Sequence, residues 1–255
     1  GMGWHSPPIP FPPDGRGNPR TTPREDAMLI LDWMQSKVIS IPPTATLLQC
    51  RKLFKEHKIN RLPVVDANNV VVGLISSSDV RSFAPSKSTG LEIIELLEIM
   101  SETKARDVMV VDPVTITYKS TIEQAAKRMI DRHVACLPVV NDEEKLVGII
   151  TGWDVFKALL DMSGAEQPGV EVGFVVPYQP GTLRELLDRL KAHGMSIISV
   201  LSSASTDGMR QVKIRFKGPD AMSQNVALEQ FRDHPGLRYW AREDEFYLKS
   251  NVDLG

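Results

Sequence analysis

Cysteine is nearly absent from this chain, since Cys50 and Cys136 are the only two among its 255 residues. Two thiols cannot form a disulfide framework, and neither stands within metal-ligand spacing of a histidine on a plausible element, so we expect no metal site and two buried, inert thiols. No apolar run approaches the ~18 residues of a membrane-spanning helix, and residues 1–26 lack the apolar stretch of a secretory signal. These absences predict a cytoplasmic protein with no membrane partner.

An excess of charge of one sign is also missing. Thirty Lys and Arg residues oppose 32 Asp and Glu residues, which gives a net charge of −2. A dedicated nucleic-acid-binding protein needs a basic face that displaces counterions from phosphates, so nucleic acid is not an expected partner. The chain also lacks Gly-x-x-x-x-Gly-Lys-Ser/Thr, Gly-x-Gly-x-x-Gly, His-Glu-x-x-His and Gly-x-Ser-x-Gly motifs. We therefore expect a protein that is not an enzyme and requires no cofactor.

Proline, by contrast, is concentrated in one stretch. Residues 1–23 hold seven of the 18 prolines, and a stretch with so few core-forming side chains cannot offset the entropy of ordering. We interpret residues 1–22 as a disordered tail, with a polyproline II ligand at residues 7–13 as the alternative. The capping box Thr22-Pro23-Arg24-Glu25 indicates that order begins there.

The most informative feature is an internal repeat with a spacing of 75 residues. On this shift Leu62-Pro63-Val64-Val65 falls on an identical Leu-Pro-Val-Val at residues 137–140, and Asp79 falls on Asp154. Between residues 32–80 and 107–155, 15 of 49 positions are identical, against about three expected from average composition. One structural unit is therefore used twice.

Each copy has the same predicted order of elements: a short strand, an amphipathic helix, two strands joined by a polar turn, and a helix that begins at Asp79 or Asp154. In the first copy the expected strands lie at residues 38–41, 62–65 and 70–76, and the first helix lies at 47–54. In the second copy the strands lie at 114–117, 137–140 and 146–151, and the first helix lies at 122–129. Between the copies, Thr89-Gly90-Leu91-Glu92 is a capping box that starts a helix with an apolar face of Leu91, Ile94, Leu97 and Met100.

The pattern changes after residue 169. A strand at 170–176 leads to a helix at 182–193, two strands joined at Asp207-Gly208, a helix to about residue 232 and a last strand at 236–242. This order, βαββαβ, is the split βαβ or ferredoxin-like motif. The expected fold class is α+β or α/β, with two βαββα units followed by a ferredoxin-like domain.

The repeated unit resembles the cystathionine-β-synthase (CBS) domain. The likeness is carried by the Leu-Pro-Val-Val stretches and by Gly-hydrophobic-hydrophobic-Ser/Thr-x-x-Asp strings at residues 73–79 and 148–154. Two such units resemble a Bateman module, and the third region is similar to an ACT domain, so the whole resembles CBS–ACT proteins of the acetoin-utilization type. The resemblance implies a CBS domain at 23–84, a connecting helix at 85–104, a second CBS domain at 105–163 and an ACT-like domain at 169–247.

The resemblance also implies a ligand, because CBS pairs bind adenosine derivatives in clefts between the copies: AMP, ADP, ATP or S-adenosylmethionine is expected. It places Asp79 and Asp154 on the ribose hydroxyls, and Ser76 and Thr151 near the phosphate. An apolar slot for the adenine is expected from Ser40, Pro63 and Val64 in the first copy and from Thr115, Pro138 and Val139 in the second. The alternative is that each Ser/Thr-x-x-Asp string only caps a helix.

The two copies differ beside these strings. Arg61 stands where the second copy has Cys136, and its guanidinium could hold a phosphate, whereas burial against Glu56 is its competing role. Trp153 stands where the first copy has Ser78, either to stack on a base or, as we favour, to fill the core or a dimer surface. These differences predict that the cleft with Arg61 prefers the more highly phosphorylated ligand.

The predicted function is a regulatory sensor that passes the binding of an adenosine ligand through the ACT-like module to an unidentified protein target. Gly181, in the first strand–helix loop of that module, is a candidate effector-loop residue because it permits close approach of the backbone to a carboxylate. The apolar helix faces at 47–54 and 122–129 exceed what one small sheet can cover, which predicts a homodimer. The alternative function is a ligand-free dimeric scaffold.

Overall fold

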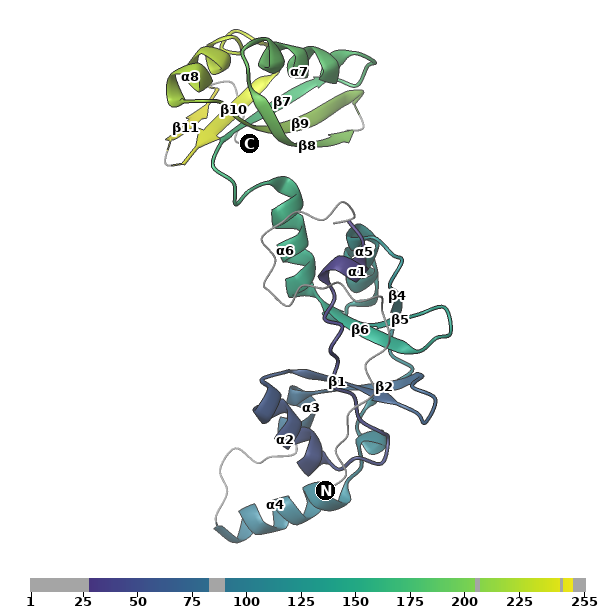
Figure 1. Ribbon diagram of the computed structural model, residues 1–255. Coiled ribbons are helices and arrows are strands. Elements are labelled where there is room, and N and C mark those ends of the chain that lie inside the picture. The colour runs from purple at the N-terminus through teal and green to yellow at the C-terminus, as the bar shows by residue number, and fades with distance from the viewer. Residues whose placement is uncertain (1–27, 83–89, 205–206, 244, 250–255) are drawn as a thin grey trace. The chain divides into compact units, whose positions relative to one another are not determined.

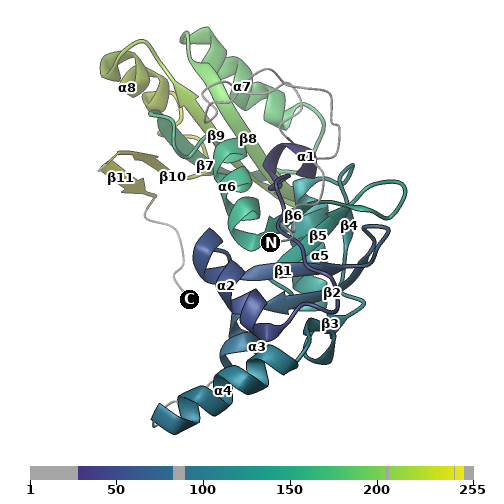
Figure 2. The same cartoon turned by 60° about the horizontal axis from the view of Figure 1, so that its bottom comes forward.

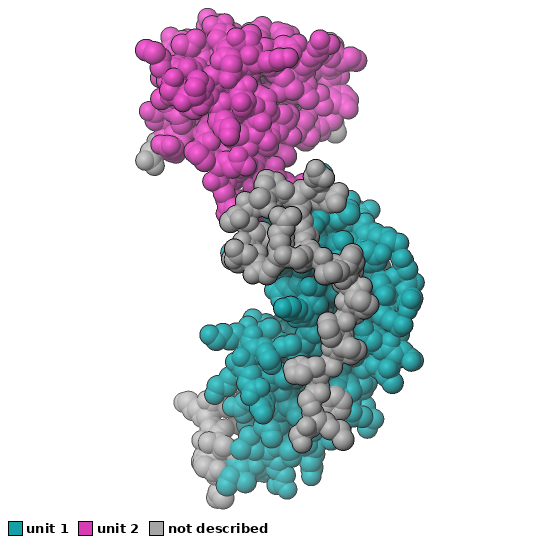
Figure 3. Space-filling view, in the orientation of Figure 1, with its two compact units in different colours: residues 1–156 teal, residues 157–255 magenta. Residues whose placement is uncertain are grey.

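The computed structural model describes residues 28–82, 90–204, 207–243 and 245–249. The chain divides into two compact units, residues 1–156 and 157–255, which Figure 3 colours separately. The predicted tail at 1–22 and the capping boxes that begin at Thr22 and Thr89 lie wholly or partly outside the described residues. Among the helices of the described ranges, none is both long and apolar enough to cross a membrane.

The first copy of the repeat consists of an antiparallel strand pair and the helices around it (Figure 1). Helix α2 (Leu47–His57) begins with a capping box in which Thr46 N donates to Gln49 Oε1 at 2.8 Å and Gln49 N donates to Thr46 Oγ1 at 3.2 Å. Strands β1 (Arg61–Val65) and β2 (Val71–Ser76) then pair, and α3 (Ser77–Ser82) follows β2 directly.

Helix α4 (Gly90–Glu102) follows the first copy and packs against α2. Met100 is buried in the core of the first copy, but Ile94 and Leu97 are exposed, so only part of the apolar face that was predicted for this helix is covered within the chain. Leu91 belongs to the helix, but its side chain lies outside the described residues.

The second copy repeats these elements 75 residues later. Helix α5 (Ile122–Arg132) begins with the same capping box, here Thr121 with Gln124. Strands β5 (Cys136–Val140) and β6 (Leu146–Thr151) pair in the register of β1 and β2, and α6 (Gly152–Ser163) follows β6. The equal caps and registers confirm that one unit is used twice.

The first strand of each copy is shorter than the sequence predicts. In the second copy it is β4 (Ile116–Thr117), which pairs parallel with β5, and in the first copy Ile41 makes a single parallel bridge to Val64. Pro42 and Pro43 follow Ile41 directly. Because proline has no N–H group to donate, it limits the backbone hydrogen bonds that this segment can form with β1.

The two copies exchange the segments that precede them. The segment with α1 (Ile30–Trp33) contacts the second copy, where Gln35 bridges to Ile149 on β6. The segment with the 3-10 helix η1 (Ala105–Asp107) contacts the first copy, where β3 (Val110–Val111) pairs with β2. Figure 2 shows the chain passing from α1, beside the second copy, to the first copy. Each copy therefore completes the sheet region of the other.

The C-terminal unit contains an antiparallel sheet with strand order β11-β10-β7-β9-β8. Along the chain its elements are β7 (Val170–Pro177), α7 (Thr182–Ala192), β8 (Ser196–Ala204), β9 (Met209–Lys217), α8 (Ala221–Glu229), β10 (Leu237–Arg242) and β11 (Glu245–Leu248). Both helices cover the same face of the sheet, as Figure 1 shows, and Phe174, Phe216 and Phe231 are buried in the core of this unit. Strand β11 was not predicted from the sequence.

Candidate functional site

The first predicted site string lies where β2 ends and α3 begins. Ser76 N and Ser76 Oγ both donate to Asp79 Oδ2, at 2.7 and 2.6 Å, and Asp79 N donates back to Ser76 Oγ at 3.2 Å. Serine and aspartate thus satisfy each other's backbone N–H groups at the start of the helix, as in a capping box. Ser76 is buried and Asp79 is partly exposed.

The second string has the same geometry between β6 and α6. Thr151 N and Thr151 Oγ1 donate to Asp154 Oδ2 at 2.9 and 2.6 Å, and Asp154 N donates to Thr151 Oγ1 at 3.4 Å. The helix cap that was weighed as an alternative is therefore present in both copies, and each helix begins two residues before its aspartate rather than at it. Within the described residues these bonds use only Oδ2 of each carboxylate, and Asp154 is buried whereas Asp79 is partly exposed.

In the first copy, strand pairing brings the predicted slot residues close together. Ile41, which follows Ser40, bridges to Val64, so Ser40 lies beside the buried Pro63-Val64 pair. Side chains alternate along a strand, however, and Val64 faces the core with no exposed surface. Pro63 lies on the opposite face of β1. The Val64 side chain is therefore part of the core, and an adenine slot at Ser40, Pro63 and Val64 stays a prediction.

The second copy repeats this arrangement. Ile116, which follows Thr115, pairs with Val139, and the side chains of Pro138 and Val139 are both buried in β5. Val139, like Val64, has no exposed surface, and the slot at Thr115, Pro138 and Val139 also stays a prediction. The carbonyl oxygen of Thr115 accepts from Arg128 Nη1 at 2.6 Å, which fixes the backbone at this edge.

Arg61 lies opposite Ser76 in the β1–β2 ladder, and its guanidinium reaches the second copy. Nη1 donates to the carbonyl oxygen of Asn60 at 2.9 Å. Burial raises the pKa of the Cys136 thiol to about 11, and the charge and hydrogen bond of Arg61 oppose part of this increase. Arg61 thus neighbours the residue that occupies its own position in the other copy. Glu56 lies 3.7 Å from Lys52, and no ion pair between Glu56 and Arg61 occurs among the described residues, so the competing role of Arg61 gains no support from Glu56.

A polar chain that sequence reasoning missed lies beside Arg61. Ser77 Oγ donates to Asn60 Oδ1 at 3.1 Å and accepts from Arg81 Nη1 at 3.1 Å. The equivalent positions in the second copy hold Ala135, Gly152 and Phe156, which cannot form such a chain. Comparison of the two copies at these three positions would have revealed it. Trp153 is 66% exposed, so it does not fill the core within the described chain.

Gly181 is the N-cap residue of α7 and has a φ of +93°, a conformation that side chains with a Cβ rarely adopt. A Cβ at this position would meet no atom within 4 Å, so the backbone here is open. In the same loop, the ring of Tyr178 has its centre 4.8 Å from the guanidinium of Arg210, which lies on β9. An effector at this loop stays a prediction.

Comparisons with known proteins bear on the repeated unit. A family model for the CBS domain matches residues 24–86 and 105–161. Protein MJ1426 of Methanocaldococcus jannaschii is 32% identical over 157 residues, which cover 53% of this chain and 93% of that protein. The chain belongs to the CBS-domain family. The two copies are therefore its first and second CBS domains.

Two further relatives of these CBS domains match about half of the chain. MJ1225 of M. jannaschii is 35% identical over 131 residues, which cover 49% of this chain and 46% of that protein, so the chain spans less than half of this relative. The crystal structure of Arabidopsis thaliana CBSX2 in complex with AMP is 29% identical, covers 52% of this chain and 97% of that chain, and has a TM-score of 0.43.

Proposed function

We propose that the chain is a non-catalytic regulatory sensor that binds an adenosine derivative, AMP, ADP, ATP or S-adenosylmethionine, in its pair of CBS domains. The observation that carries this proposal is the pair of carboxylates Asp79 and Asp154, each held in place by its own cap through Oδ2. An ionised carboxylate only accepts hydrogen bonds, so each Oδ1 suits a ribose hydroxyl. Because the caps already fix both side chains, little entropy is lost when a ligand binds.

The two clefts of the proposed sensor differ in charge and polarity. The first CBS domain presents Arg61, Arg81 and the hydroxyl of Ser77, whereas the second presents Cys136 and Gly152 at the positions of Arg61 and Ser77. Guanidinium groups hold phosphate oxygens through several N–H donors, and a thiol offers one weak donor. The cleft with Arg61 therefore takes the more highly phosphorylated ligand.

The C-terminal unit is proposed to be an ACT-like module that transmits the bound state to a protein target. Its strand order β10-β7-β9-β8, with both helices on one face, is the arrangement of the split βαβ motif, which supports this proposal. Binding would act by favouring one arrangement of the modules over another. The target protein is identified neither by the sequence nor by the site.

We also propose a homodimer, but the surface that supports it is not the pair of helix faces expected from the sequence. On the helix faces of α2 and α5, Leu47, Phe54, Ile122 and Met129 are buried in the core, whereas Leu48 is exposed, so these faces give little support for a second copy. Exposed apolar side chains occur instead along α6: Trp153, Phe156, Leu159 and Leu160.

A thermal-shift screen tests the sensor function against its alternative, a ligand-free scaffold. A ligand that binds only the native state must raise the melting temperature. We expect AMP, ADP, ATP or S-adenosylmethionine at millimolar concentration to raise it, with NAD as a further adenosine compound for comparison. If none of these compounds changes the melting temperature, the scaffold function replaces the sensor.

A further inference from the structure

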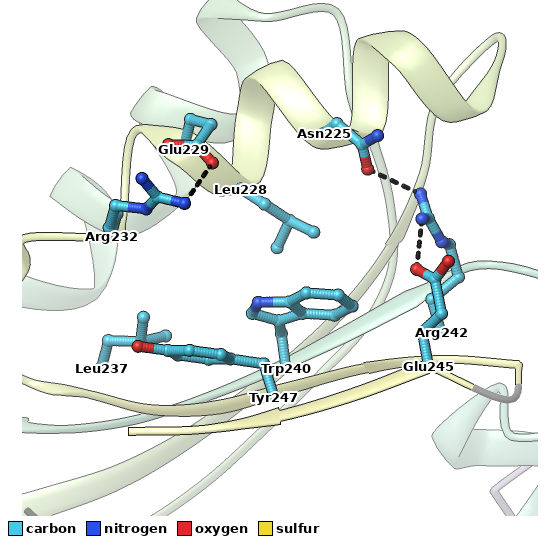
Figure 4. A pocket seen from close by; sticks show the side chains of 9 residues that line it. All are labelled: Asn225, Leu228, Glu229, Arg232, Leu237, Trp240, Arg242, Glu245 and Tyr247. Carbon is cyan, nitrogen blue, oxygen red and sulfur yellow. Dashed lines mark hydrogen bonds and ion pairs between the residues drawn. The ribbon is translucent and has the colours of Figure 1, made fainter. Parts of the chain in front are cut away.

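The C-terminal unit contains a pocket of about 360 Å³ between helix α8 and the β10–β11 hairpin (Figure 4). It lies wholly within this unit, and neither the CBS clefts nor the Gly181 loop includes any of its residues. Pockets that hold small molecules start at about 300 Å³, so this one suits a ligand of one or two rings rather than a nucleotide with several phosphates.

The floor of the pocket is aromatic and flat. Trp240 on β10 pairs with Tyr247 on β11, and their rings are stacked with centres 6.1 Å apart and planes 15° from parallel. Leu228 points from α8 toward the Trp240 ring, as Figure 4 shows, and Leu228 and Leu237 are buried. A planar apolar group between Leu228 and Trp240 would bury aromatic surface on one side and aliphatic surface on the other.

One end of the pocket presents a guanidinium that is fixed in place. Arg242 Nη1 donates to Asn225 Oδ1 at 2.9 Å, and Arg242 Nη2 donates to Glu245 Oε2. The Arg242 side chain is 16% exposed, so it is largely desolvated before any ligand arrives. Among the described residues these two partners use two of the five N–H donors of the guanidinium, and three remain for a ligand.

The charge of the lining restricts the ligand further. At the opposite end Arg232 Nη2 lies 3.1 Å from Glu229 Oε1, so the lining holds two guanidiniums and two carboxylates, and its formal charge is zero. A polyphosphate would meet both carboxylates, whereas a single carboxylate needs only the free donors of Arg242. We propose that this pocket binds a planar aromatic monocarboxylate, with its ring between Leu228 and Trp240 and its carboxylate on Arg242.

Calorimetric titration of the full chain with indole-3-carboxylate tests this proposal. We expect saturable binding at one site, and Arg242→Gln should weaken it at least about tenfold, because a charge-assisted contact is lost. The matched control is Arg184→Gln, which removes a highly exposed guanidinium paired with Asp188 on α7 and should leave the affinity unchanged. Indole-3-carboxamide, which has the same shape and no charge, should also bind at least about tenfold more weakly.

Two further measurements separate the pocket from other sites. Trp240→Leu should weaken the binding of indole-3-carboxylate without a change in the circular dichroism spectrum. If this variant does not fold, Tyr247→Leu at the exposed edge of the pocket floor takes its place. The proposal is overturned if indole-3-carboxylate, benzoate and quinoline-2-carboxylate all fail to bind at millimolar concentration. Equal losses in Arg242→Gln and Arg184→Gln would also overturn it, as would displacement of the probe by AMP.

Discussion

At the scale of single residues, Arg61 and Cys136 differ most between the two CBS domains. They occupy equivalent positions 75 residues apart, and the charge of the Arg61 guanidinium favours the ionised form of the nearby Cys136 thiol. Two arginines at these positions would repel each other, and two cysteines would leave no cation there. One arginine beside one neutral thiol therefore supplies a single positive charge to the region between the copies.

Arg61→Ala tests whether this charge contacts phosphate. We expect the variant to lose about tenfold or more in affinity for ATP or AMP, but little for adenosine, because only the nucleotides carry phosphate oxygens. Calorimetry with the three ligands measures the difference, raised salt should mimic the substitution, and Arg51→Ala on the exposed side of α2 is the control. Equal losses for adenosine and ATP would show that Arg61 supports only the fold.

Glu171 is a second residue whose ionisation matters, on the face of the C-terminal sheet opposite the helices. Tyr239 donates to Glu171 Oε1 at 2.8 Å, and Lys213 Nζ lies 3.0 Å from Oε2. Burial by itself raises the pKa of Glu171, but the Tyr239 hydrogen bond and the charges of Lys213 and Arg215 outweigh it, so the pKa lies below its usual value.

A carboxylate with a lowered pKa stabilises the fold above its unfolded pKa, and this stability is lost as the pH falls through the folded value. We therefore expect Glu171→Gln to lower the free energy of unfolding of the C-terminal unit by roughly 1–3 kcal/mol at neutral pH. The difference in free energy of unfolding between wild type and Glu171→Gln should become smaller below about pH 4.5. Urea unfolding at several pH values measures it, with the exposed Glu185→Gln as the control. A difference in free energy of unfolding that does not change with pH would contradict stabilisation by the ionised Glu171 carboxylate.

At the scale of elements, the exchanged leading segments depend on two glycines. A Cβ at Gly73 would overlap Sδ and Cγ of Met109, and a Cβ at Gly148 would overlap Sδ of Met34. Each methionine comes from the segment that precedes the other copy. The glycines therefore let these segments lie directly on strands β2 and β6.

Gly73→Ala should destabilise the N-terminal unit by about 1–3 kcal/mol, because the added methyl group overpacks the contact with Met109. In a double-mutant cycle, Met109→Ala should recover part of this loss, since it removes the overlapping atoms. Denaturant unfolding measures the four proteins, and Gly152→Ala is the control because its nearest neighbour would lie 3.8 Å away. Strict additivity of the two substitutions would show that the segments do not meet there.

The sequence predicted elements whose signals are local. The apolar spacing and the valine-rich runs place the starts of α2 and α5 and the paired strands of each copy within one residue, whereas both helices end three residues later than predicted. The exchange of leading segments was missed because it depends on pairings between distant residues, such as Gln35 with Ile149. Strand β11 was missed because it is a short edge strand whose residues are all exposed.

The site could be predicted only in part, for the same reason. The caps at Asp79 and Asp154 could be predicted because each aspartate lies three residues from its partner, and a cap needs no distant residue. The polar chain joins Asn60, directly before β1, to Ser77 and Arg81 on α3, and sequence spacing alone does not place these side chains together. The orientation of Val64 follows from the strand register and was not predicted.

At the scale of the whole molecule, the exposed apolar side chains of α6 predict self-association. We expect light scattering at micromolar concentration to give twice the chain mass of 28.4 kDa. Phe156, which is exposed, should lie in or near the contact, so Phe156→Asp should shift the protein toward the monomer. The matched control is Ile130→Asp on α5, which is also exposed. A wild-type mass of 28.4 kDa would contradict the dimer.

The central claim is that the CBS pair binds an adenosine ligand through Asp79 and Asp154. Calorimetric titration of the full chain with AMP, ATP and S-adenosylmethionine tests it most directly, in wild type, Asp79→Ala and Asp154→Ala. Asp220→Ala is the matched control, since Asp220 caps α8 through Ser223 N at 2.7 Å in the other unit. The account predicts saturable binding that each site variant weakens by ~2 kcal/mol, or about thirtyfold at its own cleft, while Asp220→Ala binds as wild type does. Absence of binding by all three ligands at millimolar concentration, or equal affinities in all four proteins, would contradict it.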